Sequence, residues 1–113
     1  MKVVEKKISI LEIKEMAKRM FGNFVKAVVD IEKGIMVVNA ELHADEEQYL
    51  LERGSKQENL WGINLYPEKD GDDFIQFDSM INLKPSQGNY SRGIEDLKIQ
   101  NKIIQIINKL VKR

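Results

Sequence analysis

The chain has 113 residues, a length that suits one domain with a single hydrophobic core. It contains no cysteine, which excludes disulfides and cysteine-ligated metal centres and fits a reducing compartment, and its 18 basic and 18 acidic residues balance, which gives no indication of nucleic-acid binding. With no secretory leader and no apolar run near the ~20 residues of a bilayer span, we expect one soluble cytoplasmic domain over residues 1–113, without a nucleic-acid or membrane partner.

The first expected elements are a short strand and a helix. Residues 2–8 alternate weakly between apolar and polar side chains, which is typical of an edge strand. Ser9 stands three residues before Glu12, the spacing of a capping box. Apolar residues then recur at helical spacing up to Gly22, a residue type that favours a left-handed helix end. The pattern predicts a helix over 10–21.

Two pairs of strands, with a helix between them, follow along the chain. The β-branched runs 24–31 and 35–42 are separated by a short connection that contains glycine, which predicts a hairpin. A capping pattern predicts a short helix over 45–53. A second pair of strands is expected over 60–66 and 74–83, joined by an acidic turn.

The chain ends in a predicted long helix over 95–112, with acidic residues at its start and basic residues at its end. Ile104 and Val111 widen its apolar stripe, which indicates either deep burial or a partner surface, such as the interface of a homodimer. The element order is therefore β-α-β-β-α-β-β-α. Because hairpins pair antiparallel and the helices are too few for a doubly wound sheet, we predict an α+β fold, with an antiparallel sheet of four to five strands and helices packed on one face.

Strand alternation separates an oily sheet face from a polar one, because successive strand side chains point to opposite sides. The oily face, expected to meet the helices, holds Val25, Ala27, Val29, Ile31, Met36, Val38, Ala40, Leu42, Trp61, Ile63, Leu65, Ile75, Phe77, Ser79, Ile81 and Leu83. The other face is mostly polar, with a few apolar residues mixed in. It is either an ordinary solvated surface or a shallow site, and its asparagines, which are poor strand formers, favour the site.

Glu41, His43 and Asp78 are the candidate catalytic residues. Glu41 lies two residues before His43, so a strand that continues this far places both on the polar face, where Asp78 joins them from another strand. A histidine with two carboxylates is a set that holds a divalent metal ion or performs acid–base chemistry. The same set also arises by chance in a chain with so many charged residues. We assign no metal site and no cofactor from the sequence.

The polar loop 85–93 is the second candidate, because a strand-to-helix junction presents backbone amides that bind anions. Its side chains would assist, although neither a P-loop nor a dinucleotide fingerprint is present. The alternative is an ordered structural loop. The candidate ligand-binding residues from the loop and the polar face together are Lys26, Asn39, Asn64, Asn82, Ser86, Asn89 and Arg92.

Several segments resemble a family of short uncharacterised prokaryotic proteins, a domain of unknown function. The resemblance covers nearly the whole chain and is carried by Lys-Ala-Val-Val-Asp-Ile-Glu-Lys-Gly at 26–34, Glu-Leu-His-Ala-Asp at 41–45, Trp-Gly-Ile-Asn-Leu-Tyr-Pro at 61–67, Asp-Ser-Met-Ile-Asn at 78–82, and Pro-Ser-Gln-Gly-Asn with Ser-Arg-Gly within 85–93. It implies a complete natural domain. It implies no activity, substrate or catalytic residue.

Three hypotheses for function remain open on the sequence. The leading one is a small binding module whose polar sheet face holds a small polar ligand or a protein segment. The alternatives are a small metal-dependent hydrolase that uses Glu41, His43 and Asp78, and a homodimeric assembly protein. The sequence does not decide whether the protein is an enzyme.

Overall fold

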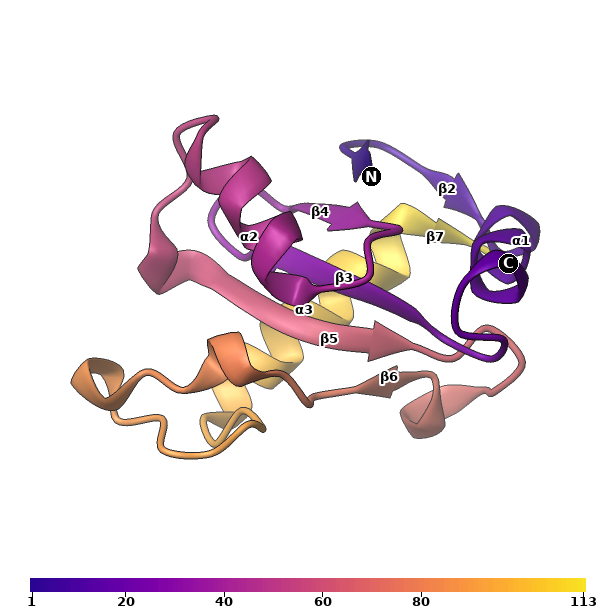
Figure 1. Ribbon diagram of the computed structural model, residues 1–113. Coiled ribbons are helices and arrows are strands. Elements are labelled where there is room, and N and C mark those ends of the chain that lie inside the picture. Colours follow the sequence, from indigo (N-terminus) through magenta and orange to yellow (C-terminus); the bar gives the residue numbers. More distant parts are fainter.

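The computed structural model describes residues 1–113 as a five-stranded antiparallel sheet with helices on both faces (Figure 1). In sheet order the strands are β1 (Lys2–Val4), β4 (Ile35–Val38), β3 (Val25–Asp30), β5 (Leu60–Leu65) and β6 (Ile75–Gln76). The helices are α1 (Ile10–Arg19), α2 (His43–Leu51) and α3 (Leu97–Leu110), with single 3-10 turns η1 (Gln57–Asn59), η2 (Gly71–Asp73), η3 (Met80–Asn82) and η4 (Pro85–Gln87). A separate parallel pair joins β2 (Ile8–Ser9) to β7 (Val111–Lys112). The predicted α+β class and antiparallel sheet are confirmed. No helix combines the length and the apolar composition needed to cross a membrane.

The main core lies between the oily sheet face and the helices α1 and α3. Side chains from β3, β4 and β5 that strand alternation assigned to this face are all buried in one cluster with the apolar stripes of the two helices. Full burial of each large apolar side chain contributes roughly 1.5–3 kcal/mol to stability, so this cluster is the principal source of folding energy. The strand residues in it are Val25, Ala27, Val29, Met36, Val38, Trp61, Ile63 and Leu65.

α2 covers part of the opposite face of the sheet, so the polar face is not wholly open to solvent (Figure 1). Val28 and Val37 are two of the apolar residues that alternation placed on that face, and both are fully buried with Leu50 of α2 in a second, smaller cluster. Leu60 of β5 belongs to the same cluster, and Ile35 of β4 packs against it, so α2 removes a small apolar area of this face from water. α1 and α3 lie on the oily face as expected, and α2 forms a third layer.

The predicted strand 35–42 ends early, and this changes where His43 lies. β4 stops at Val38, and Asn39 takes a left-handed conformation with φ of 72°. Asparagine tolerates this region better than most residues, and it turns the chain out of the sheet. His43 is therefore the first residue of α2, and the prediction that it shares a strand face with Glu41 is wrong.

The predicted strand 74–83 is also too long, because β6 ends at Gln76 and the chain then bends into η3. The hydroxyl of Ser79 caps this turn by accepting from the backbone N–H of Ile81 at 3.3 Å. Beyond β6, the Asn82 side chain takes the place of a paired strand. Its Oδ1 accepts from Gly62 N at 2.8 Å, and its Nδ2 donates to Gly62 O at 2.9 Å.

Candidate functional site

The structure does not assemble the predicted catalytic set. Glu41 is exposed in the connection before α2, and Asp78 is engaged by Arg92, whose Nε donates to Asp78 Oδ1 at 2.7 Å. His43 is buried, and its Nε2 donates to the carbonyl oxygen of Ile63 at 2.8 Å. No group of three carboxylate or histidine side chains is arranged to hold a metal ion. The metal-dependent alternative therefore lacks its geometry.

His43 serves as a structural contact between α2 and the sheet. A carbonyl oxygen only accepts, so Nε2 carries the ring proton in this bond. Burial lowers the pKa of His43 below its ordinary value, although the bond to Ile63 raises it in part, and the nearby Lys26 lowers it further. The ring is therefore neutral at neutral pH.

Glu46 is a buried carboxyl group that the sequence analysis did not single out. It lies on the inner face of α2 and is fully buried; its Oε2 accepts from Ala40 N at 3.2 Å, and its Oε1 has no partner. Burial raises the pKa of Glu46 to about 10, so the group is a neutral acid at neutral pH. The signal was present, because His43, Glu46 and Leu50 recur at helical spacing on the one side of α2 that meets the sheet.

Two of the predicted ligand-binding asparagines are buried and hold the polar loop in shape. Asn82 is bonded to Gly62 and also donates to Arg92 O at 2.9 Å. Asn89 donates from Nδ2 to Asn82 O at 2.7 Å and to Gly93 O at 2.8 Å, while its Oδ1 accepts from Glu95 N at 2.8 Å. These bonds satisfy backbone groups in a loop whose own regular pairing is an isolated antiparallel bridge between Lys84 and Asn89.

The other predicted ligand-binding residues are dispersed. Lys26 on β3 lies over the Phe21 ring, with Nζ 5.1 Å from the centroid. Asn64 on β5 donates to Gln76 Oε1 at 2.9 Å, and its buried Oδ1 has no partner. Arg92 pairs with Asp78 as described, Asn39 forms the turn after β4, and Ser86 is exposed in η4.

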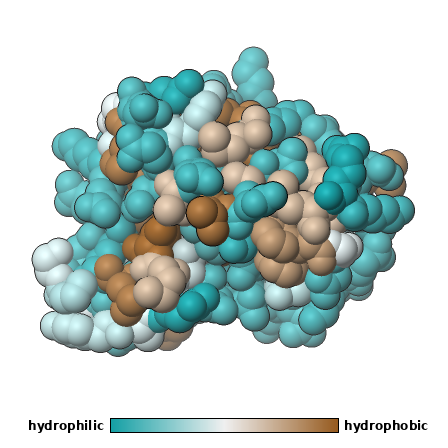
Figure 2. All heavy atoms as spheres, viewed as in Figure 1, coloured by the Kyte–Doolittle hydropathy of each residue, from teal (hydrophilic) through white to brown (hydrophobic).

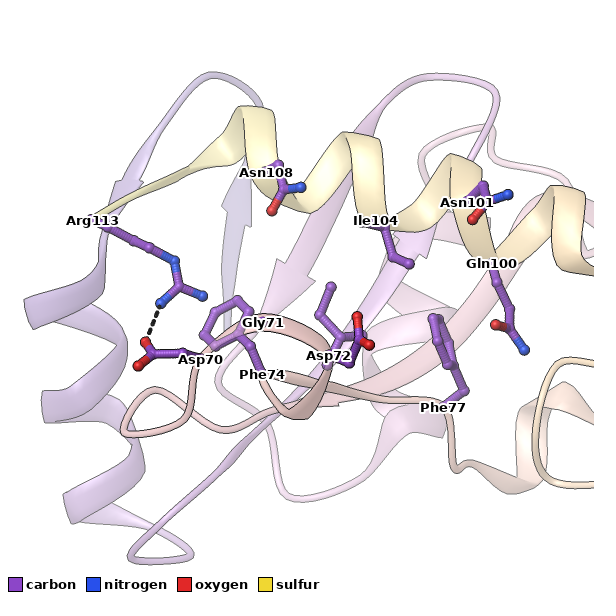
Figure 3. Close-up of a pocket in the computed structure, with 11 residues that line it drawn as sticks. Asp70, Gly71, Asp72, Phe74, Phe77, Gln100, Asn101, Ile104, Asn108 and Arg113 are labelled. Atoms are coloured by element: carbon purple, nitrogen blue, oxygen red, sulfur yellow. Dashed lines mark hydrogen bonds and ion pairs between the residues drawn. The ribbon is translucent and has the colours of Figure 1, made fainter.

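A cavity lies elsewhere, between α3 and the segment that runs from η2 through β6 (Figure 3). Its volume is about 650 Å³, and its floor is apolar, formed by Phe74, Ile75, Phe77 and Ile104. Its rim is polar and consists of Asp70, Gly71, Asp72, Gln100, Asn101, Asn108 and Arg113. Ile104 is the one residue of this cavity that the sequence indicated, because it widens the apolar stripe of α3. Its side chain is half-exposed in the cavity.

Arg113 closes one end of the cavity. Its guanidinium lies over the Phe74 ring, 4.1 Å from the centroid, and its Nη1 donates to Asp70 Oδ1 at 3.5 Å. Figure 3 shows Ile104 and Asn108 extending from α3 toward the segment that carries Phe74, so the cavity is bounded by α3 on one side and by the edge of the sheet on the other. An apolar floor with a few polar groups at the rim suits a ligand with an apolar body and a polar periphery.

Comparison with known proteins gives one match. A family described as "Protein of unknown function (DUF5674)" matches residues 2–110. Neither the curated proteins nor the solved structures contain a match.

Proposed function

The chain belongs to the DUF5674 family, whose function is unknown, and we propose that it is a small binding module whose ligand occupies the cavity between α3 and β6. The observation that carries this proposal is the cavity itself. Its volume of about 650 Å³ falls within the roughly 300–1,000 Å³ of typical ligand pockets. Its floor is apolar and its rim offers amide, carboxylate and guanidinium groups. The cytoplasmic location expected from the sequence remains a prediction.

Binding rather than catalysis fits the chemistry of the rim. The carboxylate of Asp70 is already paired with Arg113, and Gln100 donates from Nε2 to Ile94 O at 2.6 Å. The rim holds no histidine or lysine, and with no cysteine in the chain there is no thiol nucleophile. These groups orient a ligand by hydrogen bonds and charge.

The polar sheet face supplies a second candidate site, supported by the unpartnered and buried Oδ1 of Asn64 between Lys26 and Gln76. A buried acceptor without a partner is a place where a ligand donor would be stabilised. Figure 2 shows hydrophobic groups scattered among hydrophilic side chains on this face. Since α2 packs on β3 and β4 and covers part of this face, the site ranks second.

Chemical-shift mapping with a library of small amphipathic fragments distinguishes the two sites. We expect bound fragments to shift the signals of Phe74, Phe77 and Ile104. Ile104→Arg, which places a charged side chain in the cavity, should abolish these shifts, whereas Gln105→Arg at the adjacent exposed position of α3 should leave them unchanged. Fragments that shift only the signals of Lys26 and Asn64 would show that the binding site is on the polar face instead. The absence of any specific shift would refute both sites.

A further inference from the structure

The outer edge of β6 is unpaired. β6 is the last strand of the sheet and pairs only with β5. The backbone N–H of Tyr66 donates to Phe74 O at 2.9 Å, and the register continues through Leu65 opposite Ile75 to Asn64 opposite Gln76. In an antiparallel ladder the bonded pairs alternate, so the N–H and C=O of Ile75 point away from β5. Phe77 is the first residue after β6, and its N–H has no backbone hydrogen-bond partner.

The free edge is short and has a defined end. Ser79 N donates to Arg92 O at 2.9 Å, and the carbonyl oxygen of Phe77 lies near Gly93, so the chain covers the edge from there on. Three backbone groups remain open to a partner: the N–H and C=O of Ile75 and the N–H of Phe77. Short free edges of this kind resist uncontrolled aggregation but still accept one added strand.

The open edge borders the cavity. Ile75 and Phe77 contribute their side chains to the cavity floor, and Ile104 of α3 stands half-exposed beside them. A strand added at this edge would lie roughly 4.8 Å beyond β6, and every second side chain would point toward α3. The added strand would then lie beneath the part of α3 that β6 does not reach. An apolar side chain of the added strand would enter the cavity.

The charge near the cavity is negative. The turn at η2 carries Asp70, Asp72 and Asp73, and only Asp70 has a cationic partner, Arg113. A basic side chain at the matching end of the partner would face the two remaining carboxylates. Such an exposed pair adds little affinity, but it selects orientation and partner.

From these observations we infer that the occupant of the cavity is an extended peptide segment that pairs antiparallel with the free edge of β6, with an apolar side chain in the cavity and a basic residue at the η2 end. The inference rests on the proposed function, since it names the ligand class of the same site. A second copy of this chain, paired through its own β6, is the competing occupant that the experiment below separates.

The test uses the full chain and the acetylated, amidated hexapeptide Thr-Val-Thr-Val-Thr-Lys as probe. Two N-methylated forms of the peptide serve as a matched pair, one methylated at the odd-numbered residues and the other at the even-numbered residues. In an added strand only one of these two sets of N–H groups faces β6, so only one form should lose hydrogen bonds. We expect the amides of Ile75 and Phe77 to shift on binding and to exchange more slowly. One methylated form should lose about tenfold or more in affinity and the other should bind nearly as well. Replacing the lysine by glutamate should weaken binding further at low salt.

Each other outcome overturns the inference in a recognisable way. If both methylated forms bind equally while Phe74 and Ile104 shift, the cavity binds the peptide without strand addition. If fragments bind the cavity and the peptide does not, the proposed function stands and the peptide class is wrong. If neither binds, both fail. If Ile75 and Phe77 instead respond to protein concentration, and light scattering shows a dimer, the occupant is a second copy.

Discussion

Asn82 completes the hydrogen bonding of Gly62 on β5, accepting from its N–H at 2.8 Å and donating to its C=O at 2.9 Å. One side-chain amide thus replaces one residue of an absent neighbouring strand. Asn82 is fully buried, and so are the groups that it satisfies. Asn82→Ala should therefore destabilise the protein by about 2–4 kcal/mol, since two buried backbone groups lose their partners.

Chemical denaturation measures this loss. Ser86→Ala, at an exposed position in the next turn, is the control and should change the free energy of unfolding by less than about 0.5 kcal/mol. A value for Asn82→Ala that is as small as the control would show that water replaces the amide without cost.

Gly62 should not tolerate a side chain. A Cβ at this position would stand 2.5 Å from both Cβ and Oγ of Ser79 and 3.1 Å from Ile81 Cγ1. Gly62→Ala should cost about 1–3 kcal/mol or more through overpacking. Gly93→Ala is the matched control, because its nearest contact would be an ordinary 3.5 Å.

Thermal unfolding of the double variant tests the cause of that cost. Ser79→Gly removes the two closest atoms, so the combination with Gly62→Ala should be less destabilised than the sum of the single changes. If the losses of stability of the two single variants simply add in the double variant, the cost of Gly62→Ala does not come from the contact with Ser79.

Glu46 should make the protein less stable as the pH rises. Its pKa is about 10 in the folded state, against an ordinary value of 4.5, so the folded chain holds a proton that the unfolded chain releases. The stabilising contribution is complete below pH 4.5 and is lost progressively up to the folded pKa, at up to about 1.4 kcal/mol per pH unit.

Urea unfolding between pH 7 and pH 9, a range roughly above the titration of histidine, isolates this effect. Glu46→Gln keeps the size and the acceptor of the side chain but cannot ionise, so its stability should be nearly independent of pH in that range. The wild type should become steadily less stable relative to this variant. Parallel profiles for the two proteins would show that Glu46 is already ionised in the folded state.

His43 should make the protein less stable as the pH falls, the opposite of the effect of Glu46. Its folded pKa lies below the ordinary value of 6.5, so the unfolded state takes up a proton first. Stability should fall as the pH drops from about 6.5 toward the folded pKa of His43. A ring-carbon NMR titration should give a midpoint below 6.5, with Nε2 protonated in the neutral form.

His43→Ala supplies the complementary measurement. The change removes the Nε2 donor from the carbonyl oxygen of Ile63, which also faces β3, and should cost about 0.5–1.5 kcal/mol at neutral pH. Ala44→Gly, at the exposed next position in α2, controls for a general weakening of the helix start. A midpoint for His43 at the ordinary value of 6.5 would mean that the ring is solvated rather than buried.

Local chemistry predicted much of the fold. The Ser9 hydroxyl accepts from Glu12 N at 3.1 Å, as the capping pattern at the start of α1 indicated. Strand alternation assigned the buried residues of β3, β4 and β5 correctly, because a strand can bury only every second side chain on a given face. Ile104 was marked as excess apolar surface and now lies in the cavity.

The errors come from positions where one side chain overrides the pattern. The left-handed turn at Asn39 ended β4 early and moved His43 into a helix. Asn39 is a poor strand former, and this was interpreted as a sign of a binding site rather than of a strand end. Asn82 was taken for a strand residue on a polar face, whereas it replaces a strand. The cavity itself depends on the distance between α3 and β6, which is set by long-range packing and is absent from any local pattern.

Ser9 has two structural roles, one in the pairing of β2 with β7 and one at the start of α1. Its backbone lies opposite Lys112 in the parallel pair, and its hydroxyl caps α1. Residues near the last position of the chain thereby fix the start of a helix near the first. The two ends of the protein should consequently open together as one cooperative unit, so that deuterium uptake in the first turn of α1 reports whether Val111 and Lys112 are still docked.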